Sequence, residues 1–392
     1  MKITALETFH LGYDMPYSLT FARGEYQRRE ALLVKIHTDT DLVGWGEAAM
    51  WGGPHIVSAT VIEKEIAPLI VGEDPLRPEY LWEKVYQNTY YHGRKGILLS
   101  CLSGVDIALW DIVGKSMEQP LWRIFGGFGQ PLTTYASSGY YRHNYSLSDF
   151  AADIEFARKE GHVGYKIKIG NIARTVHRGT ITSTPLEVTI EEDLKRISVA
   201  RDAVGPGGEL MVDANTSFDT RTAMLYSHAM ENLDIRWFEE PVQPENINGC
   251  AELARRSRVP IAGFETETNK HSFAALIDAG AIDIVQPDIV QVGGFTEALK
   301  IAHYAQIKHL LFTSKIYSTA VSMAACAQLL FALPNANYFE VDQDPLPWRD
   351  GIVKTPAVIR DGGHVTPSPL PGIGVDIDEE ALKPWLISPD RK

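Results

Sequence analysis

The stretch GYKIKIG at residues 164–170 is followed along the chain by MVDAN at 211–215, WFEEP at 237–241 and IAGFE at 261–265. Each stretch is a short apolar run that contains or ends in charged residues. Segments with the periodicity of amphipathic helices lie between them. Strands that alternate with helices indicate βαβ units, and therefore a parallel sheet.

The same alternation continues on both sides of these stretches. Strands are expected near 132–136, 164–169, 209–213, 235–239, 261–265, 282–287, 309–313 and 337–340. Helices are expected near 147–160, 190–204, 221–231, 248–257, 269–279, 295–305 and 319–332. Such a repeat over about 240 residues predicts an α/β fold with a modified TIM barrel, (β/α)7β. The alternative, an open doubly wound sheet, should carry a glycine-rich phosphate loop after its first strand, but Gly126-Gly127-Phe128-Gly129 lies before that strand.

The N-terminal part of the chain has a different pattern. Antiparallel strands are expected at 2–11 and 30–38, and helices at 55–69, 75–90 and 98–116. We therefore predict an N-terminal α+β capping domain at 1–126, a barrel domain at 127–369, and a segment at 370–392 that returns to the capping domain. Because a barrel is open at its C-terminal end, we expect residues 13–25 to help close it.

Composition limits the classes of function. The chain has 392 residues and a net charge of -13, which argues against a nucleic-acid partner. No stretch approaches the roughly 20 apolar residues of a membrane span, and the start does not resemble a signal peptide. Cys101, Cys250 and Cys326 lack metal-ligand spacing, which favours buried free thiols and a cytoplasmic location.

Three acids recur at one βα spacing. Asp213, Glu239 and Glu265 follow one another after 26 positions each, so they should lie at the C-terminal ends of adjacent strands. Three carboxylates side by side repel one another unless a cation joins them. Oxygen ligands suit Mg²⁺ first and Mn²⁺ second. Each acid taken singly is more often a helix N-cap, but the equal spacing favours the metal hypothesis.

The preceding strand carries a lysine pair. Lys166 and Lys168 share one face of the strand, which in a barrel is the filled interior. Repulsion and burial should lower the pKa of at least one of them and make it a usable base. If both lysines instead face solvent, Tyr165, Ile167 and Ile169 face the core.

These motifs resemble those of the enolase superfamily, in particular its mandelate racemase group. The resemblance extends to most of the chain. It includes Gly44-Trp45-Gly46-Glu47, Tyr91-His92-Gly93-Arg94, Ser103 to Asp111, Gln286-Pro287-Asp288 with Gly293-Gly294, and Leu370 to Val375. Within the group, the motifs are more similar to sugar-acid dehydratases of the galactonate type than to cycloisomerases.

The resemblance implies a role for each site residue. Asp213, Glu239 and Glu265 would be the metal ligands, Lys168 the base, and Lys166 its neighbour that polarises the substrate carboxylate. Glu340 would hydrogen-bond that carboxylate, and Asp288 matches an aspartate that normally orients a catalytic histidine. That histidine position is Lys315 here. Lys315 is therefore the second acid or base, paired with Asp288, or it binds substrate while Tyr317 or water delivers the proton.

The expected reaction is removal of the α-proton of a small carboxylate substrate, followed by dehydration of a sugar acid to a 2-keto-3-deoxy acid. Epimerisation on the same site is one alternative, and a metal-dependent aldolase-type or hydrolase-type barrel is another. The expected substrate contacts come from Arg23, Trp51, Asn215 and Tyr317. The polar loop 171–185 either lies at the catalytic mouth or is a surface insertion. A homo-oligomer is expected because such assemblies are common.

Overall fold

The N-terminal region is built on a three-stranded antiparallel sheet. The computed structural model describes residues 1–49, 53–171, 186 and 188–387. Strands β1 (Ile3–Phe21), β2 (Gly24–Thr38) and β3 (Val43–Ala48) pair in that order. The predicted strands 2–11 and 30–38 are parts of β1 and β2, and β3 was not predicted. The β1–β2 hairpin also includes residues 13–25, where the sequence predicts no strand.

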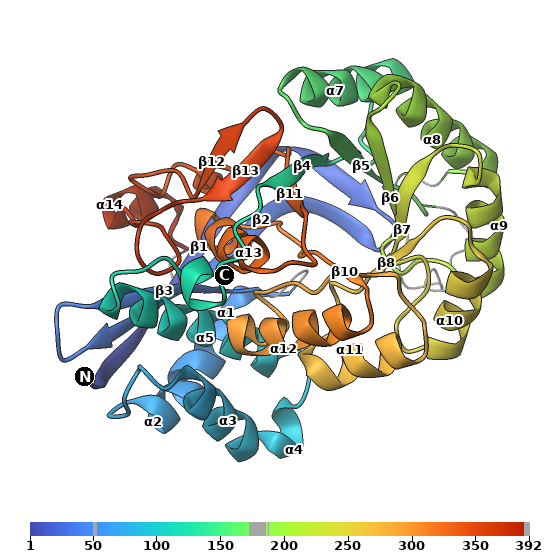
Figure 1. Ribbon diagram of the computed structural model, residues 1–392. Helices are drawn as coiled ribbons and strands as arrows, with labels where there is room; N and C mark the ends of the chain where they lie inside the picture. The colour runs from blue at the N-terminus through green and yellow to red at the C-terminus, as the bar shows by residue number, and fades with distance from the viewer. Residues whose placement is uncertain (50–52, 172–185, 187, 388–392) are drawn as a thin grey trace.

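Helices cover one side of this sheet and form the lower edge of the molecule (Figure 1). They are α1 (His55–Val61), the π-helix η1 (Ile62–Ile66), α2 (Ala67–Ile70), α3 (Pro78–Asn88), α4 (Tyr90–Gly93), α5 (Ile97–Ser116) and α6 (Leu121–Ile124). Helix α5 is long and apolar enough to cross a bilayer, with a mean hydropathy of 1.7, but 83% of that apolar window is buried. It packs against β2, β3 and the barrel helix α12, as a core helix does.

The central part of the chain forms the barrel. Its strands are β4 (Leu132–Ser137), β5 (Gly164–Lys168), β6 (Glu209–Asp213), β7 (Ile235–Glu239), β8 (Ile261–Gly263), β9 (Ile284–Val285), β10 (Leu311–Phe312) and β11 (Tyr338–Asp342). Neighbours from β4 to β10 pair in parallel. Strand β11 pairs in parallel with β4, and Phe312 bridges to Ala336, so the sheet closes on itself. The predicted barrel is confirmed, although β8, β9 and β10 are shorter than expected.

In the described part of the chain, seven helices connect these strands, and they form an arc outside them (Figure 1). They are α7 (Leu147–Lys159), α8 (Ile190–Val204), α9 (Thr220–Met230), α10 (Ile247–Arg256), α11 (Asn269–Asp278), α12 (Gly294–Ile307) and α13 (Ala320–Ala332). Local sequence fixes several starts. Ser146 with Asp149 and Thr189 with Glu192 form capping boxes, which satisfy the first free N–H groups of α7 and α8. Each predicted helix lies within two residues of its observed ends.

The chain after β11 adds elements that the sequence did not reveal. They are the 3-10 helix η2 (Pro347–Arg349), the hairpin β12 (Val358–Asp361) and β13 (His364–Pro367), α14 (Glu379–Leu382) and the 3-10 helix η3 (Lys383–Trp385). Strand β13 pairs with the start of β4. The Ile373 N–H then donates to Asp111 of α5, and the Ile387 N–H donates to the carbonyl of His10 in β1. The alternating Val375-Asp376-Ile377 is not a strand; Ile377 makes an isolated bridge to Val353.

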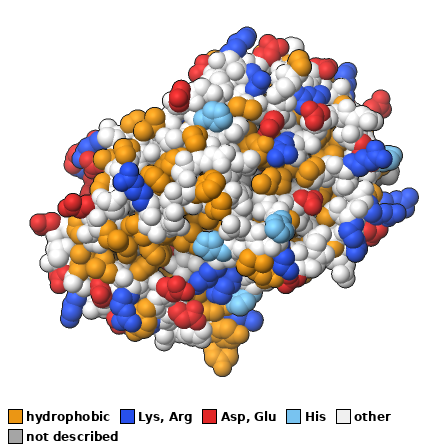
Figure 2. Space-filling model, in the orientation of Figure 1, with side chains coloured by type: hydrophobic (Ala, Val, Ile, Leu, Met, Phe, Trp, Pro, Cys, Tyr) orange, Lys and Arg blue, Asp and Glu red, His pale blue; other side chains and the backbone are white. Residues whose placement is uncertain are grey.

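The core is apolar, and charged groups are dispersed over the surface. Cys101, Cys250 and Cys326 are buried free thiols, as predicted. On the face shown in Figure 2, acidic and basic side chains are interspersed between hydrophobic patches. The buried ionisable groups of the molecule are therefore the informative exceptions, because burying a charge is costly unless it is paired.

Candidate active site

Three of the predicted residues lie level with one another at the ends of adjacent barrel strands. In the parallel register, Lys168 of β5 is opposite Asp213 of β6, and Asp213 is opposite Glu239 of β7. Glu239 is in turn opposite Ala262 of β8, and Glu265 follows three positions later. The equal spacing in sequence thus brings these groups to one edge of the sheet.

Each of the three acids is paired with a lysine. Lys168 Nζ bonds to Asp213, Lys166 Nζ lies 2.6 Å from Glu239 Oε1, and Lys315 Nζ lies 2.7 Å from Glu265 Oε2. Both lysines of β5 are buried and point into the barrel. The solvent-facing alternative for this pair is therefore excluded.

Glu340 lies on the other side of the lysine pair. Its Oε1 is 2.8 Å from Lys166 Nζ, and its Oε2 accepts a hydrogen bond of 3.1 Å from the Ile316 N–H. Asp288 is fully buried at the end of β9 and forms a backbone bridge with Lys315, and its carboxylate accepts from the Val290 N–H at 3.1 Å. Lys315 therefore enters the same cluster as Lys166, as its position at a strand end predicts.

Burial and charge pull the pKa values of these groups in opposite directions. Burial lowers the pKa of Lys166, but Glu239 and Glu340 outweigh it and raise the pKa above its usual value. The pKa of Lys315 is likewise raised, because Glu265 and Glu340 overcome burial. Burial raises the pKa of Glu340, but Lys166, Lys315 and Lys168 bring it down to about 2. The pKa of Lys166 is therefore shifted in the direction opposite to the lowering expected for at least one lysine of the pair, because two carboxylates contact its ammonium group.

The cluster holds more carboxyl groups than ammonium groups. Six carboxyl groups, those of Asp213, Glu239, Glu240, Glu265, Asp288 and Glu340, stand against the ammonium groups of Lys166, Lys168 and Lys315. The pKa of Glu240 is raised well above its usual value, first by burial and then by its acidic neighbours Glu265, Asp213 and Glu239. Carboxyl groups that outnumber the ammonium groups around them could be neutralised by a divalent cation.

The donor chemistry fits a hard cation. Asp213, Glu239 and Glu265 offer only oxygen atoms, which suit Mg²⁺ or Mn²⁺. Asn215 adds a buried oxygen, Oδ1, for which the described residues provide no hydrogen-bond partner. The oxygens of the three acids are not gathered within 4.8 Å of one another, since each is paired with an ammonium group. The residues therefore fit such an ion in the chemistry of their donor atoms.

The capping strands enclose this cluster. A cavity of about 40 Å³ is lined by Lys168, Lys315, Glu265, Asn215, Tyr140, Tyr317, Phe21 and Tyr26. Phe21 and Tyr26 come from the β1–β2 hairpin. The expectation that residues 13–25 reach the barrel mouth is therefore confirmed. A second cavity of about 490 Å³ shares Phe21, Tyr26, Asn215 and Glu265 with the first, and it has room for a ligand of several carbon atoms.

The residues expected to contact substrate have different surroundings. Asn215 and Tyr317 line the small cavity, and Arg23 lines only the larger one. Arg23 Nε donates to the Asn215 carbonyl at 3.2 Å and to Thr216 Oγ1 at 3.0 Å, so it ties the hairpin turn to the loop after β6. Trp51 and residues 172–185 lie outside the described residues.

Four residues of this region were missed by sequence reasoning. Phe21, Tyr26 and Tyr140 form the aromatic wall of the small cavity, and Glu240 adds a buried acid beside Glu265. Tyr140 follows β4 directly, and this position in a barrel mouth was a usable signal. Tyr26 gave no such signal, and Phe21 was covered only by the expectation that residues 13–25 close the barrel, because the fold alone brings the hairpin over the barrel.

The cap motifs form the joint between the two sheets. Glu47 of β3 accepts from Thr319 Oγ1 at 2.6 Å and from the Ser322 N–H at 3.0 Å, at the start of α13. Asp106 of α5 accepts from the N–H and the hydroxyl of Thr296, at 2.9 and 2.6 Å, at the start of α12. Gly294, with φ 73°, lies against this carboxylate, where a side chain would clash. These acids fasten the cap to barrel helices and do not line the small cavity.

Comparison with known proteins agrees with this arrangement. Residues 6–126 match the mandelate racemase / muconate lactonizing enzyme N-terminal domain, and residues 149–381 match the enolase C-terminal domain-like family. The chain belongs to the mandelate racemase group of the enolase superfamily. It is 32% identical to the D-galactarolactone cycloisomerase of Agrobacterium fabrum, over 97% of this chain and 98% of that protein. It is 33% identical to the arabinonate dehydratase of Saccharolobus solfataricus, over 91% and 90% of the two chains.

Solved structures of this group have the same fold. A 3,6-anhydro-D-galactonate cycloisomerase from Zobellia galactanivorans superposes with a TM-score of 0.86 at 29% identity, covering 99% of this chain and 100% of that one. A racemase from Streptomyces coelicolor A3(2), solved with bound magnesium, superposes with a TM-score of 0.87 at 27% identity, covering 98% and 100%. The superfamily therefore contains members that bind magnesium, dehydrate sugar acids or isomerise them.

Proposed function

We propose that this protein is a Mg²⁺-dependent sugar-acid dehydratase that converts a small hydroxylated carboxylate to a 2-keto-3-deoxy acid. The observation that carries the proposal is the small cavity in which Lys168 and Lys315 meet between Asn215 and Glu265. Two proton-transfer groups that line one cavity suit a reaction that removes one proton and delivers another. The names of similar proteins, which include D-galactonate and arabinonate dehydratases, support the class of substrate.

The first step falls to the lysine pair. Lys168, at the edge of the cavity, removes the α-proton of the bound carboxylate as a general base. Lys166 is held as an ammonium between Glu239 and Glu340, so it provides a fixed positive charge for the substrate carboxylate as negative charge develops there. Asp213, Glu239 and Glu265 would hold the ion, which when bound stabilises the same developing charge.

The second step falls to Lys315. A hydroxyl on the β-carbon leaves as water when Lys315 donates a proton to its oxygen. The C–O bond breaks, the α–β double bond forms, and the resulting enol takes a proton to become the 2-keto acid. Glu340, whose Oε2 already binds the Ile316 N–H, holds the loop that carries Lys315 beside the substrate. Phe21 and Tyr26 exclude water from this space.

A substrate screen tests the proposal. Purified protein with Mg²⁺ is incubated with a panel of aldonates and aldarates, and 2-keto acids are trapped with semicarbazide. We expect turnover of at least one sugar acid, its loss after EDTA treatment, and its loss in Glu239→Gln. Full turnover after exhaustive chelation would contradict the metal-dependent proposal. A panel with no 2-keto acid but with a changed configuration at the α-carbon would identify an epimerase instead.

A Lys315 variant tests the division of roles. We expect Lys315→Met to retain exchange of the α-proton with solvent deuterium, because Lys168 is intact, while 2-keto acid formation falls by about 100-fold or more. Mass spectrometry of recovered substrate measures the exchange. If exchange and product formation fall equally, Lys315 is the abstracting base or a binding group. If neither falls, the proton comes from Tyr317 or water.

Epimerisation is the second candidate, and the same pair of lysines is the observation that favours it, since a second group at the α-carbon returns a proton to the other face. An aldolase would instead form a Schiff base on a lysine, which borohydride traps in the presence of a keto acid.

We further propose the division into 1–126, 127–369 and 370–392, a homo-oligomeric assembly and a cytoplasmic location. Size measurement in solution tests the assembly.

A further inference from the structure

Three metal-binding side chains meet in the cap, away from the barrel cavity. His10 comes from β1, Glu30 from β2 and His55 from the start of α1. One ligand atom of each lies within 4.8 Å of those of the other two, which holds for no other such group in the described residues. The residues are far apart in sequence, so the cluster exists only because the hairpin and the helix pack together.

The carboxylate of Glu30 is oriented by a different partner on each oxygen. Its Oε2 lies 2.8 Å from His10 Nε2 and 3.6 Å from His55 Nδ1. Its Oε1 accepts from Arg28 Nε at 3.3 Å. One oxygen thus faces two imidazole nitrogens while the other is fixed by a guanidinium. Ligating carboxylates in metal sites are commonly held in this way by a hydrogen bond to their second oxygen.

We propose that His10, Glu30 and His55 form a second metal site, selective for Zn²⁺ or a similar borderline transition ion. Two imidazole nitrogens and one carboxylate oxygen are a recurrent Zn²⁺ donor set, and water completes the tetrahedron. Mg²⁺ is a poor occupant because it prefers oxygen ligands. The site differs chemically from the all-oxygen acid cluster of the barrel. Zn²⁺ would therefore prefer His10, Glu30 and His55, and Mg²⁺ would prefer the acid cluster.

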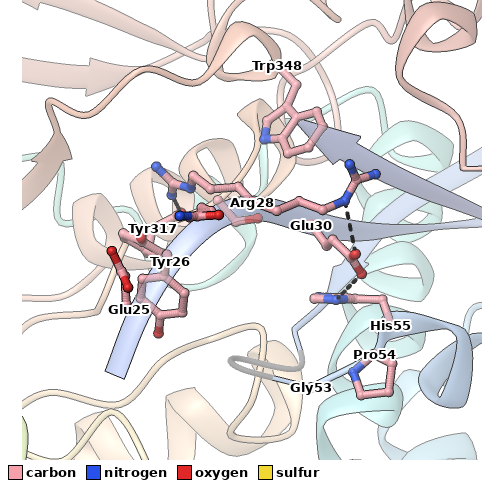
Figure 3. A pocket seen from close by; sticks show the side chains of 12 residues that line it. Glu25, Tyr26, Arg28, Glu30, Gly53, Pro54, His55, Tyr317 and Trp348 are labelled. Carbon is pink, nitrogen blue, oxygen red and sulfur yellow. Dashed lines mark hydrogen bonds and ion pairs between the residues drawn. The ribbon is translucent and has the colours of Figure 1, made fainter. Parts of the chain in front are cut away.

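The surroundings allow an ion to enter. The side chains of His10 and His55 are 14% and 4% exposed, whereas that of Glu30 is 26% exposed. Glu30 and His55 line a cavity of about 430 Å³ between the hairpin and the barrel, shown in Figure 3. The cavity also contacts Tyr26 and Tyr317, which line the small catalytic cavity. A bound ion would cross-link β1, β2 and α1, and so hold the strand that carries Tyr26 over the barrel.

Metal titration tests the site in the full-length protein. Chelator-treated protein is titrated with ZnCl2 by calorimetry in the presence of excess Mg²⁺, which occupies the oxygen site. We expect one Zn²⁺ equivalent in the wild type and a rise in melting temperature on binding. His10→Ala and His55→Ala should weaken binding by about 100-fold or more. Arg28→Gln should weaken it by about 10-fold, because Arg28 only orients the carboxylate of Glu30 and does not bind the ion. His37→Ala is the matched control, since His37 pairs with Glu7 on the same hairpin at 3.0 Å, and the described residues provide no third ligand there.

Other results would overturn the proposal. Unchanged Zn²⁺ affinity in both His10→Ala and His55→Ala, or Zn²⁺ binding lost only in Glu239→Gln, would place the ion in the barrel. Anomalous scattering from a zinc-soaked wild-type crystal gives an answer that does not depend on folding of the variants; a peak absent from His10, Glu30 and His55 removes the site. Because the dehydratase assay uses Mg²⁺ alone, failure of either proposal leaves the other standing.

Discussion

Two regions of this protein contain acids whose partners differ. At the barrel mouth, Asp213, Glu239 and Glu265 are each paired with a lysine ammonium. At the joint between cap and barrel, Glu47 and Asp106 are bound by backbone N–H groups and threonine hydroxyls at the starts of two helices. In the first region the acids pair with ammonium groups, which can exchange protons. In the second region the carboxyl groups cap the starts of helices across the interface between cap and barrel.

The kind of partner distinguishes acids that take part in the reaction from acids that hold the cap on the barrel. Both sets belong to the motifs by which the sequence resembles its superfamily, so motif membership does not distinguish them. The nature of the partner does. A lysine can gain or lose a proton and can yield its place to an ion, but a backbone N–H cannot. We therefore expect substitutions at the barrel mouth to change rate more than stability, and substitutions at the joint to do the reverse.

The largest expected effect is on the barrel side. Lys168→Met should lower the turnover number by about 1000-fold and abolish exchange of the α-proton with solvent, because a general base supplies roughly 10²–10⁴ of rate. Deuterium incorporation into recovered substrate measures it. The control is Lys354→Met, which alters an exposed lysine that is 57% accessible and paired with Asp376. Retained exchange in Lys168→Met would transfer the role of base to Lys315.

The strand-end positions could be predicted because parallel strands repeat at a fixed period. The apolar runs before Asp213, Glu239 and Glu265 place these residues at strand ends from the sequence alone, with no distance between side chains needed. The partners could not be predicted from that period. That Lys315 would lie beside Glu265 depends on side-chain lengths and on the curvature of the barrel. The sequence therefore indicated which groups meet, but not which pairs form.

Other features were missed for local reasons. Residues 13–25 contain Pro16, Gly24 and several polar residues, so their alternation is too weak to predict a strand, although they continue β1 and β2. Strands β9 and β10 pair over two residues each, and an apolar run does not show where pairing ends. The β12–β13 hairpin follows the last barrel strand, where the βα repeat no longer applies.

An intermediate effect is expected at Asp106, as a dependence of stability on pH. Burial raises the pKa of Asp106 to about 7, against hydrogen bonds from Thr296 that lower it; Glu297 raises it further and Lys300 lowers it. Since the pKa is raised in the folded state above its unfolded value, the protonated form is favoured by folding. The protonated Asp106 carboxyl therefore makes its full contribution to the free energy of unfolding below about pH 4, and this contribution is lost as the pH rises to about 7.

Asp106→Asn removes this proton-linked contribution. The wild-type free energy of unfolding minus that of the variant should fall between pH 4 and pH 7, by on the order of 3–4 kcal/mol at most. Urea denaturation at several pH values measures it. The matched control is Asp202→Asn on the exposed face of α8, whose difference from wild type should not vary in this way. A constant difference for Asp106→Asn would mean that the carboxyl is already ionised at low pH.

The smallest effect is expected at Glu47. Burial raises the pKa of Glu47, opposed by hydrogen bonds from Ser318, Thr319 and Ser322. Glu47→Gln keeps one carbonyl acceptor for these donors but turns an amide N–H toward one of them. We therefore expect a loss of about 1 kcal/mol in the free energy of unfolding, the usual size for one buried hydrogen bond. The turnover number should stay within about threefold of wild type, because Glu47 binds the start of α13 and lies outside the cavity.

Glu380→Gln, at a side chain that is 80% exposed, is the control for loss of one negative charge. If the turnover number of Glu47→Gln falls tenfold without loss of stability, the joint acts on Lys315 through the loop 316–319. The distinction between acids that act in the reaction and acids that hold the cap on the barrel would then not hold for the loop 316–319, which joins the two regions.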